Sequence, residues 1–130
     1  MEEQNKKKKK ILIIEDEALQ LKLLGDVFAA EGFDVLKAGD GEEGLRVALK
    51  ERPDLILLDI ILPRMNGITV LKELRKDSWG KNVPVVILTN LVEVEKAKEA
   101  LEEGVYDFLI KANCSLDEIV KKVKEGLVNR

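Results

Sequence analysis

Three short apolar runs constrain the fold of this chain more than any other feature. They are Ile11–Ile14, Leu55–Leu58 and Val83–Leu88, and a polar side chain directly follows each of them. An apolar run of this length between turn signals is typical of a strand that is buried on both faces. Pro63 and the pair Asn66-Gly67 supply such signals after the second run. The sequence therefore predicts a sheet that other elements cover on both sides.

Stretches with helical periodicity separate the predicted strands, and this alternation indicates a parallel sheet with right-handed crossovers. Two further runs, Phe33–Ala38 and Val105–Ile110, mix polar and apolar residues. Edge strands of a covered parallel sheet tolerate such a mixture, whereas central strands do not. The strand order 2-1-3-4-5 satisfies this condition and creates a switch point between strands 1 and 3. We therefore predict an α/β fold, a flavodoxin-like (βα)5 three-layer sandwich with a five-stranded parallel sheet.

Local signals mark the ends of the predicted helices. Asp40 is a predicted N-cap, and Ser115 and Glu118 have the spacing of a capping box. Gly32 and Gly104 are expected to end two other helices. Apolar residues at spacings of three and four predict the inward faces. These faces are Leu21, Leu24 and Phe28; Leu45, Ala48 and Leu49; Gly67, Val70, Leu71 and Leu74; Val94, Ala97 and Leu101; and Leu116, Ile119, Val120, Val123 and Leu127.

Composition narrows the classes of protein to which the chain can belong. Its 130 residues suit a single domain, predicted at residues 10–130 after a polar, lysine-rich leader at residues 1–9. We interpret the leader as a solvated segment, with weak contact to an anionic surface as the alternative. The net charge of −3 gives no case for direct nucleic-acid binding. No stretch approaches the roughly 20 apolar residues of a membrane span.

The reactive side chains available to the chain are limited. Cys114 is the single cysteine, so no internal disulfide can form, and a reducing compartment such as the cytoplasm is expected. The chain contains no histidine. Any step that needs an imidazole must therefore be supplied by a partner.

Polar side chains stand where the predicted strands end. Glu15 and Asp16 follow the first strand, Asp59 the third, Thr89 the fourth and Lys111 the fifth. Because parallel strands share one carboxyl edge, the three carboxylates should crowd together. Two like charges ~4 Å apart repel by about 4 kcal/mol at an effective dielectric of 20, so a proton or a cation must offset them. Oxygen ligands favour Mg²⁺, and a carboxylate can itself accept a phosphoryl group.

Four stretches together resemble the receiver domain of bacterial response regulators (CheY-like), over about Lys10–Val128: Ile11–Glu17, Pro53–Asp59 with Pro63 and Gly67, Val85–Thr89, and Phe108–Lys111. The resemblance implies a phospho-acceptor signalling switch of a two-component phosphorelay, and not a dedicated enzyme. A sensor histidine kinase, a phosphotransfer protein or a small phosphodonor would load it. The surface of the fourth helix, fifth strand and fifth helix would then change its binding to an unknown downstream protein, and a phosphorylation-dependent dimer is a further expectation.

The resemblance also assigns roles to individual positions. Asp59 is the implied phospho-acceptor, Thr89 and Lys111 are the implied contacts of the phosphoryl group, and Phe108 is the implied switch residue that turns inward on activation. The implied ligands of Mg²⁺, or of Mn²⁺ in its place, are Asp16, Asp59, the main-chain carbonyl of Ile61 and, through water, Glu15.

The sequence departs from the family pattern in four places. Glu15 stands where aspartate is commoner, and Phe108 lacks the hydroxyl of the usual tyrosine. Ala112 follows the lysine where proline is usual, and a cis bond before alanine would cost ~3 kcal/mol instead of ~0.5–1 kcal/mol. Ile61 and Leu91 occupy positions that tune phosphate loss in the family. Two apolar residues there should exclude water, so we expect a long-lived phosphorylated form.

A second hypothesis is a receiver-like interaction module that is not phosphorylated, and the missing proline motivates it. Partner binding that ignores phosphodonor and Mg²⁺ would favour that hypothesis. A dedicated hydrolase is less favoured, because Ile61 stands where a second aspartate would be needed. A flavin or dinucleotide binder is disfavoured too, because Glu15-Asp16-Glu17 offers no glycines and the wrong charge for a bare phosphate.

Overall fold

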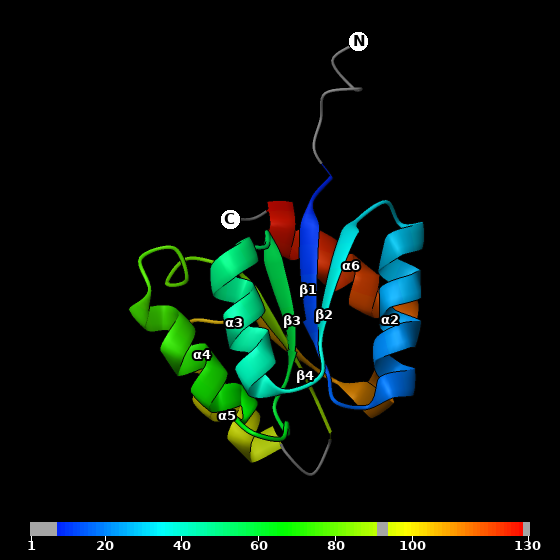
Figure 1. Ribbon diagram of the computed structural model, residues 1–130. Helices are drawn as coiled ribbons and strands as arrows, with labels where there is room; N and C mark the ends of the chain where they lie inside the picture. Colours follow the sequence, from blue (N-terminus) through cyan, green and yellow to red (C-terminus); the bar gives the residue numbers. More distant parts are fainter. Residues whose placement is uncertain (1–7, 91–93, 129–130) are drawn as a thin grey trace.

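Strands and helices alternate along the chain in a computed structural model that describes residues 8–90 and 94–128 (Figure 1). The strands are β1 (Lys10–Ile14), β2 (Asp34–Ala38), β3 (Leu55–Asp59), β4 (Val85–Thr89) and β5 (Asp107–Ile110). The helices are α2 (Ala18–Ala30), α3 (Gly41–Glu51), α4 (Gly67–Lys76), α5 (Val94–Leu101), α6 (Leu116–Val128) and the short 3-10 helix η2 (Lys111–Asn113). In this numbering the fourth and fifth predicted helices are α5 and α6. No helix of the described part is both long and apolar enough to cross a membrane.

The five strands form one parallel sheet in the order β2-β1-β3-β4-β5, as predicted. Every residue of β3 and β4 is buried, and so are the four apolar residues of β1. The edge strands are more exposed to solvent: β2 has two exposed residues, and β5 has none that is fully buried. The pattern of polar residues therefore identified the edges correctly. Both β4 and β5 begin two residues later than expected, at Val85 and Asp107.

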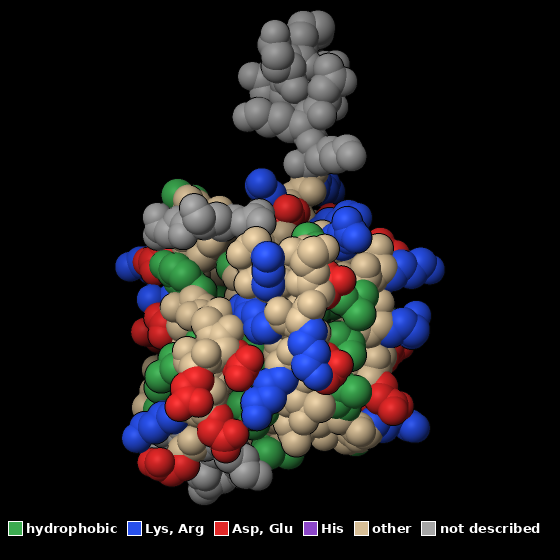
Figure 2. Space-filling model, turned by 90° about the vertical axis from the view of Figure 1, so that its left-hand side faces the viewer, with side chains coloured by type: hydrophobic (Ala, Val, Ile, Leu, Met, Phe, Trp, Pro, Cys, Tyr) green, Lys and Arg blue, Asp and Glu red, His purple; other side chains and the backbone are tan. Residues whose placement is uncertain are grey.

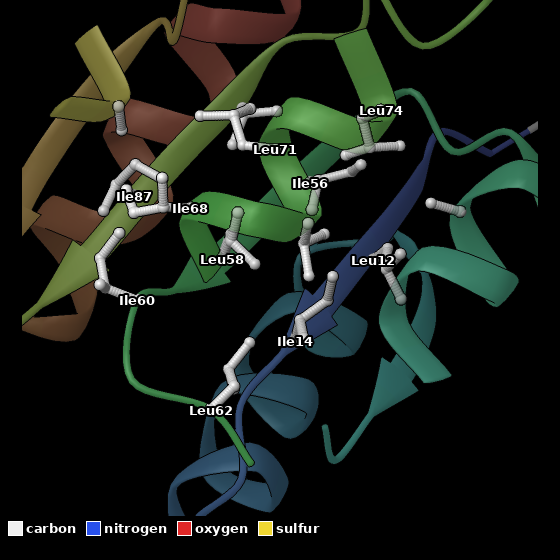
Figure 3. Packing of buried hydrophobic residues seen from close by; sticks show 14 of the residues in the cluster. Leu12, Ile14, Ile56, Leu58, Ile60, Leu62, Ile68, Leu71, Leu74 and Ile87 are labelled. Carbon is white, nitrogen blue, oxygen red and sulfur yellow. The ribbon is translucent and has the colours of Figure 1, made fainter. Parts of the chain in front are cut away.

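Successive residues of the strands contribute to two separate cores, because side chains alternate across a sheet. One core lies between the sheet and helices α3, α4 and α5, and Figure 3 shows its strand residues Leu12, Ile14, Ile56 and Leu58 against Leu71 and Leu74 of α4. The other core lies between the sheet and helices α2 and α6 (Figure 1) and contains the residues next to them in sequence, Ile11, Ile13, Leu55 and Leu57. The predicted three-layer sandwich is therefore confirmed.

The predicted helix caps are present. The Asp40 side chain accepts a hydrogen bond from the Glu43 main-chain nitrogen at 2.8 Å. At the start of α6, the Ser115 hydroxyl oxygen accepts from the Glu118 nitrogen at 3.2 Å, and the Glu118 carboxylate accepts from the Ser115 nitrogen at 2.8 Å. Gly32 follows α2 with a φ of 95°, a left-handed conformation that a glycine adopts without strain. The hydrogen bonds at Asp40 and at Ser115 satisfy main-chain amides that have no partner within the helix at its start.

Two of the predicted inward positions are wrong. Leu49 of α3 and Leu101 of α5 are 38% and 48% exposed. Among the described side chains of α5, Ala97 is fully inaccessible, as predicted, and so is Ala100, which was not predicted. A stripe at spacings of three and four includes residues at its margin, and the small alanines let α5 lie close to the sheet with Leu101 beyond the contact. The side chain of Val94, which was expected beside them, lies outside the described residues.

Candidate functional site

The carboxyl ends of β1 and β3 bring three carboxylates together at the switch point of the sheet. Oxygen atoms of Glu15, Asp16 and Asp59 all lie within 4.8 Å of one another. Glu15 and Asp59 are buried, at 2% and 6% exposure, whereas Asp16 is exposed. The sheet register explains this meeting, because Ile14 pairs with Leu58 and the next residue of each strand is acidic. The predicted acidic cluster is therefore present.

Lys111 provides the positive charge of the site. It follows β5 directly, and its Nζ donates hydrogen bonds to Glu15 Oε1 at 2.9 Å and to Asp59 Oδ2 at 3.1 Å. Burial disfavours the ammonium form, but the hydrogen bonds to Glu15 and Asp59 outweigh it and raise the pKa of Lys111. Lys111 therefore stays protonated and bridges the two buried carboxylates across the rim of the sheet.

The Asp59 carboxyl has a strongly raised pKa. Burial raises its pKa to about 6, the Lys111 ammonium opposes that rise, and the nearby Glu15 carboxylate adds to it. The cause is physical: a charge removed from water is disfavoured unless it is neutralised, and one lysine serves more than one acid here. Asp59 is still largely ionised at neutral pH, and an ionised carboxylate can act as a nucleophile.

Strand alternation places Thr89 differently from the other site residues. Glu15, Asp59 and Lys111 continue the residues that point toward α2 and α6. Thr89 continues those that point toward α3, α4 and α5. Thr89 is fully buried, and its hydroxyl donates to the main-chain oxygen of Asn90 at 3.3 Å. It ends its strand at the predicted rim but faces the α5 side of the sheet.

A cleft of about 470 Å³ opens over the acidic cluster. The lining residues are Glu15, Asp16, Glu17, Gln20, Asp59, Ile61, Asn90, Lys111 and Ala112. The sequence argument gave no role in the site to Gln20 or Asn90. Asn90 could have been found from its position directly after Thr89, whereas Gln20 comes from α2 and carried no signal in the sequence.

The remaining predicted positions have different outcomes. Ile61 is 41% exposed and lines the cleft. Phe108 is half-buried on β5 and packs against the core under α3, α4 and α5. Leu91 lies outside the described residues. The described part contains no cis peptide bond, so the bond between Lys111 and Ala112 is trans and leads into the 3-10 helix η2.

The residues of the site suit a hard divalent cation. The cluster has three carboxylates and one ammonium, so it carries excess negative charge. The atoms that its acidic side chains offer to a metal are all carboxylate oxygens. Mg²⁺ prefers such ligands, while soft metals prefer sulfur or imidazole nitrogen. The chain has no histidine, and Cys114 is not among the residues that line the cleft. The donor set therefore fits Mg²⁺ better than zinc or copper.

The contribution of Asp59 to the stability of the metal-free protein is expected to fall as the pH rises from about 4 to about 7. The folded state holds the Asp59 proton up to pH of about 6, whereas an unfolded aspartate releases it near pH ~3.9. At this position the folded state thus binds more protons in this window, and the contribution of Asp59 to stability falls with pH by up to about 3 kcal/mol. Lys111 has a raised pKa and keeps its charge throughout, so it adds no slope.

Thermal unfolding in the presence of a chelator, followed across this pH range, measures the effect. Asp59→Asn has no proton to exchange at this position and serves as the control. The difference between the two proteins isolates Asp59 from the other acids of the chain. An equal pH dependence of the melting temperature in both proteins would contradict the raised pKa.

Comparison with known proteins identifies related sequences over nearly the whole chain. The sequence model of the family described as "Response regulator receiver domain" matches residues 11–124. The DNA-binding response regulator MtrA of Mycolicibacterium paratuberculosis is 40% identical over 120 residues, which cover 92% of this chain and 52% of that protein. The probable transcriptional regulator ycf27 of Porphyridium aerugineum is 40% identical over 104 residues, 80% of this chain and 42% of that protein. The chain thus spans about half the length of these relatives or less.

Solved structures with the same fold agree with these matches. A putative response regulator from Chloroflexus aurantiacus superposes with a TM-score of 0.87 at 30% identity, covering 95% of this chain and 100% of that one. The receiver domain of the sensor histidine kinase PA1611 from Pseudomonas aeruginosa superposes with a TM-score of 0.85 at 25% identity, with the same coverage of both chains. That structure holds a magnesium ion in its active-site cleft.

Proposed function

Because this chain belongs to the response regulator receiver-domain family of two-component systems, we propose that it is a phospho-acceptor switch with Asp59 as the acceptor. One observation carries the assignment to Asp59. Its buried carboxylate lies in the acidic cluster, and its Oδ2 lies 3.1 Å from the Lys111 ammonium. Nucleophile, excess negative charge and cation thus share one cleft. The protein would take a phosphoryl group from a sensor histidine kinase, a phosphotransfer protein or a small donor such as acetyl phosphate.

In the proposed step, an Asp59 carboxylate oxygen attacks the phosphorus atom of the donor. A new O–P bond forms while the bond between phosphorus and the donor's nitrogen or oxygen breaks, and its electron pair leaves with the donor. The charge of Asp59 at neutral pH provides the attacking electron pair. Bound Mg²⁺ would offset the negative charge of the phosphoryl oxygens. The chain supplies the nucleophile and the orientation. A protein donor would supply the phosphorylated imidazole, and a small donor such as acetyl phosphate needs none.

The other site residues would act on the phosphoryl group after transfer. Lys111 Nζ, which now bridges Glu15 and Asp59, would pair with a phosphoryl oxygen. The Thr89 hydroxyl would give up its bond to the Asn90 oxygen, a long one at 3.3 Å, and donate to the phosphoryl group instead. We assign the metal to Asp16, Asp59 and the main-chain oxygen of Ile61, with Glu15 acting through water.

We propose that the output surface is formed by α5, β5 and α6, where the downstream protein or a second phosphorylated copy would bind. Thr89 and Phe108 point toward the α5 side of the sheet, so a change at Thr89 reaches this surface through the core. Of this surface, Figure 2 shows α5, on the side of the sheet that also carries α3 and α4; basic and acidic side chains both appear on that side, and hydrophobic ones form only small groups. Recognition there would depend on local arrangement more than on net charge. The proposal places the protein in the cytoplasm, where a kinase has access to ATP.

Intact mass spectrometry after incubation with acetyl phosphate tests the proposed function. The wild-type protein is expected to gain the mass of one phosphoryl group with Mg²⁺ present and none in excess chelator. A protein that binds Mg²⁺ but gains no phosphoryl mass would contradict the proposal. Such a result would favour the alternative of a receiver-like interaction module that is not phosphorylated.

The phosphorylated form is expected to persist for minutes or longer after the donor is removed. The apolar Ile61 side chain lines the cleft beside Asp59 and offers no hydrogen bond to an attacking water. Ile61→Asn is expected to speed phosphate loss about tenfold, which corresponds to about 1.4 kcal/mol of barrier. Leu49→Asn, a similar change at an exposed position of α3, is the control. A wild-type half-life of seconds would contradict the water-exclusion argument.

A further inference from the structure

Arg75, in the last turn of α4, donates hydrogen bonds to four main-chain carbonyl oxygens. Its Nε donates to Glu103 at 2.8 Å, and its Nη2 to Gly104 at 2.6 Å. Its Nη1 donates to Gly80 at 2.6 Å and to Val83 at 2.9 Å. The guanidinium is planar and presents its donors as a rigid fork, so one side chain can serve acceptors on two segments at once. The proposed phosphoryl chemistry makes no use of this arrangement.

The four acceptors belong to two loops at the edge of the sheet opposite Asp59. Gly80 and Val83 lie in the loop that leads into β4, and Glu103 and Gly104 form the turn that leaves α5 for β5. The main-chain nitrogens of this turn already donate back to Ala100 and Leu101, within the last turn of the helix. Its carbonyl oxygens accept from Arg75. A cation at a helix carboxyl end is also favoured by the helix dipole.

The loop before β4 has hydrogen bonds and close contacts of its own, apart from those to the Arg75 guanidinium. Asp77 Oδ2 accepts hydrogen bonds from the main-chain nitrogens of Trp79 at 2.9 Å and Gly80 at 2.8 Å. Gly80 packs so closely on the end of α4 that a Cβ there would overlap the carbonyl group of Leu74. The Gly80 oxygen is therefore held in place by contacts that do not involve α5. Arg75 therefore links the carboxyl end of α5 to the loop before β4.

The described side chains of α5 bury little that could replace this attachment. The fully buried residues in its described part, Ala97 and Ala100, are small, and Leu101 is 48% exposed. Each buried CH₂ stabilises by about 0.8 kcal/mol, so alanines contribute little compared with a large apolar side chain. Hydrogen bonds from a charged donor are among the stronger ones in proteins. The hydrogen bonds of Arg75 at the carboxyl end therefore contribute strongly to the attachment of α5.

We propose that Arg75 is a positioning residue that fixes the carboxyl end of α5, so that phosphorylation changes the position of the other end. The chain passes from Thr89, at the rim beside Asp59, to the start of α5 at Val94. A helix that is fixed at one end and displaced at the other pivots about the fixed end. The anchor itself follows from the contacts of Arg75, while the pivot rests on the proposed function.

Hydrogen–deuterium exchange of the whole chain tests both parts. Without phosphodonor, Arg75→Met is expected to speed amide exchange in residues 99–106 about tenfold, with α2 and α6 unchanged as a check on folding. Arg75→Lys keeps the charge but has one nitrogen, so it is expected to exchange nearly as fast as Arg75→Met. Lys76→Met, whose side chain is 71% exposed and pairs with Glu73, is the matched control and should behave as wild type.

With acetyl phosphate and Mg²⁺, the change in exchange is expected to stay within the first half of α5 in wild type and to extend to residues 99–106 in Arg75→Met. Equal exchange of residues 99–106 in Arg75→Met and Lys76→Met without donor would overturn the anchor. A wild-type change that covers residues 99–106 as strongly as the first half of α5 would overturn the pivot. Absence of phosphoryl mass in wild type would overturn the proposed function and the pivot with it, while the comparison without donor decides on the anchor alone.

Discussion

Asp59→Asn is expected to gain no phosphoryl mass from acetyl phosphate and Mg²⁺ under conditions that phosphorylate the wild-type protein. The amide keeps the size of the carboxylate but is neutral, so the attacking anionic oxygen is lost. The substitution also removes one of the three carboxylates that would hold the metal. Both losses act on the same step, and phosphorylation should fall to background in intact mass spectra.

Asp54→Asn is the matched control for this experiment. Asp54 lies directly before β3, at the edge of the sheet away from the cleft, and its Oδ2 accepts from the Lys10 main-chain nitrogen at 2.7 Å. Its loss should lower stability slightly and leave the phosphorylation rate unchanged. Phosphoryl mass on Asp59→Asn at the wild-type level would place the acceptor elsewhere, and peptide mapping of the product would then identify it.

Gly67→Ala is expected to lower the free energy of unfolding by about 3 kcal/mol, at the upper end of the range for overpacked sites. Gly67 begins α4, and its nitrogen donates to the Ile60 oxygen at 2.7 Å. A Cβ would overlap the Asp59 carbonyl oxygen and would lie 2.8 Å from Ile60 Cα. These are main-chain atoms that cannot rotate away, so the strand end that carries Asp59 would have to shift.

Urea or thermal unfolding measures this change, and a loss of this size should lower the melting temperature by about 10 °C. Gly39→Ala is the control, because a Cβ at Gly39 meets nothing within 4 Å. A melting temperature of Gly67→Ala equal to that of Gly39→Ala would contradict the close approach between α4 and the end of β3. The folded fraction of Gly67→Ala should also phosphorylate more slowly, because the overlapped atoms belong to the acceptor residue.

The strand order could be predicted from the sequence because strands that are buried on both faces consist of apolar residues throughout. Residues 11–14, 55–58 and 85–88 are apolar throughout, whereas Asp34 and Lys37 in β2 are exposed. In a covered parallel sheet this difference separates central from edge strands. The buried faces of the helices were predicted less accurately. The positions of Leu49 and Leu101 were wrong because a helical stripe does not say where its contact with the sheet ends.

The sequence by itself determined that acids, a hydroxyl and a lysine would end strands at one rim, since strand direction and order follow from local patterns. Only the tertiary structure decided which of them meet. Side-chain alternation in each strand sends Glu15, Asp59 and Lys111 to one side and Thr89 to the other. The packing of α2 brings Gln20 to the cleft, and the packing of loops brings four carbonyl oxygens to Arg75. Contacts between segments distant in sequence depend on strand register and packing, and a local sequence pattern does not predict them.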